Sequence, residues 1–209
     1  MLHKKGRISA ESEVEMVNRL NIIAEISKNY RGVGEVFGRF WKNYGGISAV
    51  LLSPYFHAAI IFTGALYPIW IAPGWHEIVK TVMPSMVSFS LGGFAIWLAL
   101  GDQHFRSIIC GCEDENEQSI YMAVNSSFLH FIILQILSIL VAIFAESWLP
   151  DKAPMTLAAN AFSFLGFLVF SYALLSGVAS AMAIYRVASW YDNAMTIMKR
   201  RQANTISSD

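Results

Sequence analysis

The sequence predicts an all-α, polytopic membrane protein with four transmembrane helices. Four long stretches are apolar and almost free of charge: residues 47–72, 82–100, 121–145 and 157–185. A helix needs about 20 predominantly apolar residues to span a bilayer core roughly 30 Å thick, and each stretch has about that length. Of the 209 residues, 55% are hydrophobic and 14% are charged, whereas a soluble domain has about 25% charged residues. Because little chain remains outside these stretches, no separate soluble catalytic domain is expected.

Three parts are expected along the chain. Residues 1–46 would form a cytoplasmic amphipathic helix and a basic connector, residues 47–185 a four-helix transmembrane domain, and residues 186–209 a cytoplasmic helical extension and tail. The amphipathic helix is predicted over 12–30, where apolar side chains recur at helical spacing: Met16, Leu20, Ile23, Ile26 and Tyr30. It can pack on the bundle, lie in the lipid interface or recognise another protein. Glycines and basic residues over 31–46 predict a flexible connector beside anionic lipid.

Prolines and small residues mark three of the spans. Pro54 removes a backbone donor and predicts a kink in the first span, whereas Pro84 falls in the first turn of the second, where the missing donor costs little. Small residues at spacing four let helices approach closely, and they form two strips: Ser88 and Gly92 in the second span, and Ala173, Gly177 and Ala181 in the fourth. Both strips predict helix–helix contact within or between subunits, with a pore lining as the alternative. The fourth span is expected to continue through 186–200 as one long helix, because that segment contains no Gly or Pro.

The third span is the polar one. Four of its side chains fall within an arc of about 140° on a helix: Ser127, His130, Gln135 and Ser138. Lipid cannot satisfy such groups, so this face is predicted to point into the bundle interior or a water-filled cavity. In one interpretation it only hydrogen-bonds to neighbouring helices. In the other it lines a wet path or ligand pocket, with His57 as candidate partner and His130 titrating near its usual pH of about 6.5.

The distribution of basic residues predicts that both termini are cytoplasmic. Lys and Arg near span ends set orientation. With both termini inside, eight basic residues before the first span, one in the loop after the second and four after the last are cytoplasmic, against two outside. Aromatic residues such as Trp41 and Tyr44 flank the spans at the level expected for lipid headgroups. The predicted location is a membrane that the chain crosses several times, with both termini on its cytoplasmic side.

Several kinds of chemistry find no support in the sequence. No span carries Asp, Glu, Lys or Arg near its middle, which argues against a proton-driven carrier, a paired-aspartate hydrolase and an ion filter of charged rings. Cys110, Cys112 and His104 provide too few ligands for a zinc site, which needs four at established spacings. Nucleotide-binding and hydrolase motifs are absent. Neither a cofactor, a metal nor direct nucleic-acid binding is therefore expected.

Three functions remain open. The first is a non-enzymatic homo-oligomer that acts as a channel, sensor or membrane anchor. The second is a transporter of a small neutral solute, and the third is a membrane-embedded enzyme that modifies lipid. Packing strips, an amphipathic helix and an extended last helix without a catalytic set favour the first.

The span layout of 47–185, with no enzymatic motif, resembles the membrane subunit of the Kiwa phage-defence system. The resemblance covers layout only and assigns no residue a role. It implies a tetrameric inner-membrane assembly that senses infection and works with a soluble cytoplasmic partner. Loop 101–120 and helix 12–30 would then be the surfaces for that partner.

Overall fold

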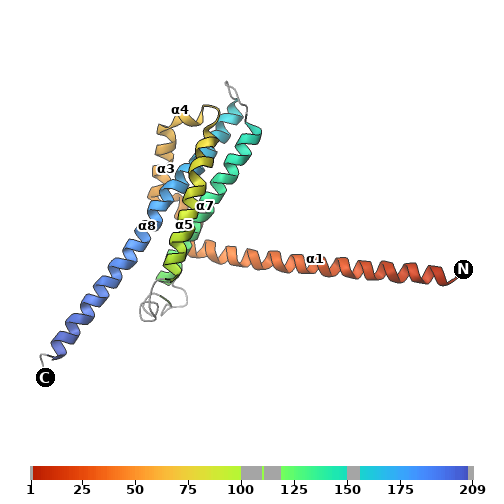
Figure 1. Cartoon of the computed structure of the whole chain (residues 1–209), viewed down its shortest axis with the longest axis horizontal. Coiled ribbons are helices and arrows are strands. Elements are labelled where there is room, and N and C mark those ends of the chain that lie inside the picture. Colours follow the sequence, from red (N-terminus) through yellow and green to blue (C-terminus); the bar gives the residue numbers. More distant parts are fainter. Residues whose placement is uncertain (1, 100–109, 111–118, 150–155, 207–209) are drawn as a thin grey trace. The chain divides into compact units, whose positions relative to one another are not determined.

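The computed structural model describes residues 2–99, 110, 119–149 and 156–206, and every regular element in them is an α-helix (Figure 1). The predicted all-α class is therefore confirmed. The chain divides into two units, Met1–Lys42 and Asn43–Asp209. Loop 101–120, predicted to contact a partner, lies almost wholly outside the described residues, as do His104 and Cys112.

The first unit consists of helix α1 (Leu2–Tyr44), whose last two residues belong to the second unit. Its helix is uninterrupted over 31–44, where the sequence analysis expected a flexible connector. Glycine inside a helix costs about 1 kcal/mol relative to alanine, so isolated glycines weaken a helix without ending it. Phe37 and Trp41 lie one helical turn apart, and their rings stack with centroids 6.4 Å apart. Contacts at this spacing stabilise a helix.

The apolar side chains predicted for the amphipathic face of α1 are exposed where the structure describes them. Their exposed fractions are 58% for Met16, 61% for Ile23, 49% for Ile26 and 77% for Tyr30. Because the described residues of 21–39 are exposed on all sides of α1, these values do not distinguish an apolar face, and the amphipathic helix stays a prediction.

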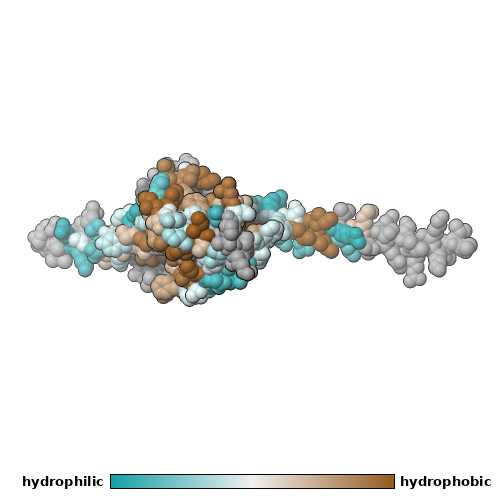
Figure 2. Space-filling view, turned by 90° about the horizontal axis from the view of Figure 1, so that it is seen from above, coloured by the Kyte–Doolittle hydropathy of each residue, from teal (hydrophilic) through white to brown (hydrophobic). Residues whose placement is uncertain are grey.

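The second unit is a helical bundle of α2 (Gly46–Leu51), α3 (Pro54–Ala65), α4 (Tyr67–Trp70), α5 (Trp75–Ala99), α7 (Ile120–Trp148) and α8 (Leu157–Ile206). Helix α7 packs against both α5 and α8, and α3 packs against the side of α8 (Figure 1). Three segments are long and apolar enough to cross a membrane: α5, α7 and Leu157–Asn193 of α8. Large apolar side chains on their outer faces are exposed, including Phe89 at 84% and Leu165 at 58%, and brown hydrophobic patches cover much of the bundle in Figure 2. These features indicate a multi-pass membrane protein.

The predicted first span is not a single helix, so the count of four spans is not confirmed. Residues 47–72 form α2, α3 and α4, and the longest, α3, has 12 residues. At 1.5 Å per residue it is about 18 Å long, well below a bilayer core of about 30 Å. Prolines explain the breaks, because Pro54 begins α3 and Pro68 lies in the first turn of α4.

Helix α5 begins earlier than predicted, and Pro84 lies in its interior rather than in its first turn. The sequence analysis excluded the polar residues before 82 from the span. In this segment Lys80 Nζ lies 2.8 Å from Glu77 Oε1 on the same helix and 2.7 Å from Glu146 Oε1 on α7. These ion pairs compensate the charges of the helical turns that precede the predicted span.

Helix α8 is continuous from Leu157 to Ile206, so the expected long last helix is confirmed. Its 50 residues correspond to about 75 Å. This length is more than twice a bilayer core of about 30 Å.

Two apolar clusters form the core of the bundle. One contains Trp75, Val79, Met83, Ala142, Ala145, Phe167, Phe170 and Ala173. The other contains Trp97, Val124, Phe128 and Val187. Along α7, the segment 130–138 separates the two clusters, and its buried side chains include three polar ones.

Candidate functional site

Buried polar side chains gather in the middle of the bundle. The residues that the structure describes include ten of them, none a carboxylate or an ammonium: Thr63, Ser90, Ser126, His130, Gln135, Ser138, Ser163, Ser171, Ser176 and Ser180. We call the ten without Ser126 and Ser163 the polar layer. Six of these eight lie along their helices between the two apolar clusters, and the other two, Thr63 and Ser171, are hydrogen-bonded to each other beside the first cluster. Such groups need partners in a bilayer, since hydrocarbon offers none.

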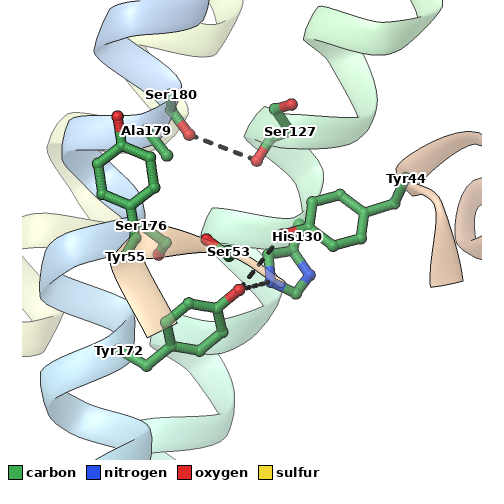
Figure 3. Close-up of a pocket in the computed structure, with 9 residues that line it drawn as sticks. All are labelled: Tyr44, Ser53, Tyr55, Ser127, His130, Tyr172, Ser176, Ala179 and Ser180. Atoms are coloured by element: carbon green, nitrogen blue, oxygen red, sulfur yellow. Dashed lines mark hydrogen bonds between the residues drawn. The ribbon is translucent and has the colours of Figure 1, made fainter. Parts of the chain in front are cut away.

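His130 on α7 is the chemical centre of the polar layer. Its Nε2 lies 3.2 Å from the Tyr172 hydroxyl on α8, which lies 3.3 Å from the Tyr44 hydroxyl (Figure 3). The Tyr44 ring stacks on the imidazole, with centroids 3.9 Å apart and planes at 18°. Two phenols thus hold one imidazole from two sides.

The glycines after Tyr44 place its ring. Gly45 has φ 101° and Gly46 has φ 68°, in the left-handed region that L side chains rarely adopt. A Cβ at Gly45 would also come within 2.9 Å of the Ala49 Cβ. The chain therefore leaves α1 immediately after Tyr44 and begins α2, with the phenol left beside His130.

A cavity of about 60 Å³ adjoins this cluster. Hydroxyls and aromatic rings dominate its lining, which consists of Tyr44, Ser53, Tyr55, Ser127, His130, Tyr172, Ser176, Ala179 and Ser180 (Figure 3). One water needs about 10–15 Å³ of such space and two to four polar partners, so the cavity can hold a few waters. Its lining offers hydrogen bonds but no carboxylate to activate a nucleophile.

The remaining polar groups mostly join helices. Gln135 Nε2 donates to Ser90 Oγ on α5 at 3.0 Å, and Thr63 Oγ1 on α3 donates to Ser171 Oγ on α8 at 3.0 Å. Two buried atoms, Gln135 Oε1 and Ser138 Oγ, have no partner among the described residues. A buried polar group left unpaired costs about 1–3 kcal/mol, which makes this end of the polar layer its least stable part.

The predicted polar face of the third span is distributed as follows. His130, Gln135 and Ser138 are buried with exposed fractions of 6%, 0% and 1%. Ser127 is half-buried, and its hydroxyl donates to its own helix at the Ala123 carbonyl, 3.0 Å away. Its backbone carbonyl accepts from Ser180 Oγ at 3.4 Å.

His57, the partner expected for His130, does not contribute to this cluster. It is exposed in the first turn of α3, where its ring lies 6.4 Å from that of Phe56. Tyr44 and Tyr172 take the place predicted for it. Tyr44 was expected at the headgroup level, and Tyr172 lay unremarked in the middle of an apolar stretch, where a phenol needs a buried partner. That position was the available signal.

The two strips of small residues have different surroundings. A Cβ at Gly177 would lie 2.8 Å from Phe131 Cζ on α7, and Ala173 is fully buried. Ala181, Ser88 and Gly92 are exposed. A Cβ at Gly92 would meet nothing within 4 Å.

Among the glycines for which the structure describes the surroundings, Gly166, which the sequence analysis did not single out, has the closest approach. A Cβ there would come within 2.5 Å of the Trp75 ring, whose Nε1 donates to Ser163 Oγ at 3.0 Å. The contact joins residues 91 positions apart in sequence, so no local pattern could have predicted it.

The part of the chain that the structure describes contains no group of three or more potential metal ligands. Comparisons with protein-family models, curated proteins and solved structures give no match for this chain.

Proposed function

We propose that the protein is a non-enzymatic, homo-oligomeric anchor and sensor in the bacterial inner membrane that communicates with a soluble cytoplasmic partner. The observation that carries the proposal is the continuity of α8, which runs from the polar layer to Ile206 without a break. A helix of about 75 Å extends far beyond a bilayer core of about 30 Å. It can therefore connect an event in the membrane to a protein outside it.

The chemistry of the polar layer supports a role other than catalysis. Its described groups are neutral hydroxyls, an amide and an imidazole that hydrogen-bond to one another. Among the described residues no three potential metal ligands come together, and the lining of the cavity beside His130 contains no carboxylate that could act as a base.

Two surfaces support assembly. Ser88 and Gly92 leave an open, small-residue strip on the outer face of α5, which suits close packing with a second copy. The exposed apolar side chains of α1 suit a soluble partner. The span layout resembles that of the Kiwa membrane subunit. From this resemblance we propose that the assembly is a tetramer and that it acts in phage defence.

The test is the mass of the full-length particle purified in mild detergent, with its co-purifying proteins identified. We expect several copies per particle and one soluble protein. Gly92→Leu should lower the mass, and the matched Gly64→Leu, also in open space, should leave it unchanged. Monomeric wild-type particles without a partner would overturn the proposal. Phage plating with and without the gene tests the defence setting.

A channel is the second candidate, because the exposed Ser88–Gly92 strip could line a path between subunits as readily as an interface. Ion flux in liposomes distinguishes the two. A flux that Gly92→Leu blocks, while the particle mass stays unchanged, would favour the channel.

A further inference from the structure

A second cavity, of about 300 Å³, lies between the start of α7 and the middle of α8, outside the polar layer. Each helix contributes one face, with residues at spacings of three and four: Ile120, Ala123, Val124 and Ser127 from α7, and Ala183, Arg186, Val187 and Trp190 from α8. Ligand pockets begin at about this volume. Most of its wall is aliphatic, and its one charge is a guanidinium.

Arg186 occupies a distinct position on α8. It is the first charged residue after the apolar run 157–185, which places it where the bilayer core gives way to headgroups. Within the described residues it makes no ion pair. A guanidinium at the edge of an apolar cavity favours a bound anion, and its planar fork matches phosphate oxygens.

Trp190 completes the arrangement. It follows Arg186 by four residues on the same helix face. Indoles favour the headgroup level because they combine an apolar ring with a hydrogen-bond donor. Along α8 the cavity is therefore lined, in order, by Ala183, the Arg186 guanidinium, Val187 and the Trp190 indole.

We propose that this cavity binds an anionic phospholipid, with the phosphate at Arg186 and an acyl chain against Ala123, Val124 and Val187. Apolar walls and a cation match the two ends of a lipid, whereas a free phosphate would use the cation alone. The inference depends on the membrane placement and orientation in the proposed function, which put the site in the cytoplasmic leaflet, the side where anionic lipids attract cations.

The experiment is a lipid titration of the full-length protein in detergent, followed by native mass spectrometry. We expect the wild type to bind phosphatidylglycerol several-fold more tightly than phosphatidylcholine. A cation at an anionic surface contributes about 1 kcal/mol, so Arg186→Gln should weaken phosphatidylglycerol binding roughly fivefold. Arg200→Gln removes the same charge from an exposed position on the same helix and should have no effect. Excess inorganic phosphate should not displace the lipid.

A second pair of variants tests the apolar wall with Arg186 intact. Ala123→Phe should fill the cavity and weaken lipid binding, and the exposed Ala181→Phe, outside the cavity, should not. Equal binding of the two lipids by the wild type, or equal losses in Arg186→Gln and Arg200→Gln, would overturn the inference. The titration needs neither an oligomer nor a partner. Lipid binding can therefore be absent while the proposed assembly is found, and lipid binding can be found while the proposed assembly is absent.

Discussion

Gly177 and Gly92 belong to strips that look alike in sequence but have different surroundings. At Gly177 a Cβ would lie 2.8 Å from the Phe131 ring, so this glycine lets α8 approach α7 within the chain. At Gly92, on the exposed face of α5, a Cβ would have no atom of the chain within 4 Å. Small residues at spacing four therefore predict that helices can meet there, but not whether the second helix belongs to the same chain.

The largest expected effect separates the two glycines. Gly177→Leu should destabilise the monomer, because overpacking a core typically costs about 1–3 kcal/mol, and should lower the melting temperature in detergent. Gly92→Leu should destabilise the monomer much less, because nothing in the chain lies within 4 Å of a Cβ there, and its main effect should be on particle mass. Adding Phe131→Ala should restore part of the stability lost in Gly177→Leu. Equal stability of the two single variants would mean that the Phe131 contact carries no constraint.

The next prediction compares the loss of the acceptor and the loss of the donor in one hydrogen bond of the polar layer, between Gln135 and Ser90. Ser90→Ala removes the acceptor of Gln135 Nε2 and leaves a fully buried amide without partners, which should cost about 1–3 kcal/mol. Gln135→Leu removes that amide, while Ser90 Oγ keeps its bond to the Met86 carbonyl at 2.6 Å. We expect Gln135→Leu to cost less than Ser90→Ala in denaturation experiments. The opposite order would indicate that an unseen water satisfies the amide.

His130 provides a smaller effect and decides between its two sequence-based interpretations. His130→Gln keeps a donor and an acceptor near Tyr172 but loses the stacking on Tyr44, worth about 0.5–1.5 kcal/mol. If His130 is structural, the variant should be slightly less stable, and liposomes with either protein should show no change in ion flux between about pH 5.5 and 7.5. A wild-type response to pH that His130→Gln abolishes would instead place His130 on a wet path.

Ser88→Ala should have the smallest effect on stability. The Ser88 hydroxyl is exposed and donates to its own helix at the Pro84 carbonyl, 3.0 Å away. Exposed substitutions of this kind usually change stability by less than about 0.5 kcal/mol. Thermal melts of Ser88→Ala beside the buried Ser176→Ala test the difference between the outer strip and the polar layer. A loss for Ser88→Ala as large as that for Ser176→Ala would contradict this prediction and show that the Ser88 hydroxyl has a partner besides the Pro84 carbonyl.

The sequence predicted the helices better than it predicted which side chains contact one another across them. Apolar length located α7 and α8 and most of α5, and a polar arc identified His130, Gln135 and Ser138. It missed Tyr172 and Tyr44, because a helical period defines a face without giving the height of the opposite helix. It also placed Pro84 in a first turn, because the pairing of Lys80 with Glu146 on α7, which extends α5, depends on a helix more than 60 residues away in sequence.

Because α8 is continuous, a small tilt of the helix near the polar layer produces a larger displacement at its far end. From Ser180, in the polar layer, the helix runs on to Ile206, a further distance of about 39 Å. A tilt of about 5° at Ser180 would displace the far end by about 3 Å, a distance comparable to a hydrogen-bond length of about 2.9 Å. Under the proposed function, a change in the polar layer too small to alter packing there would be large enough at Ile206 to make or break a contact with the expected partner.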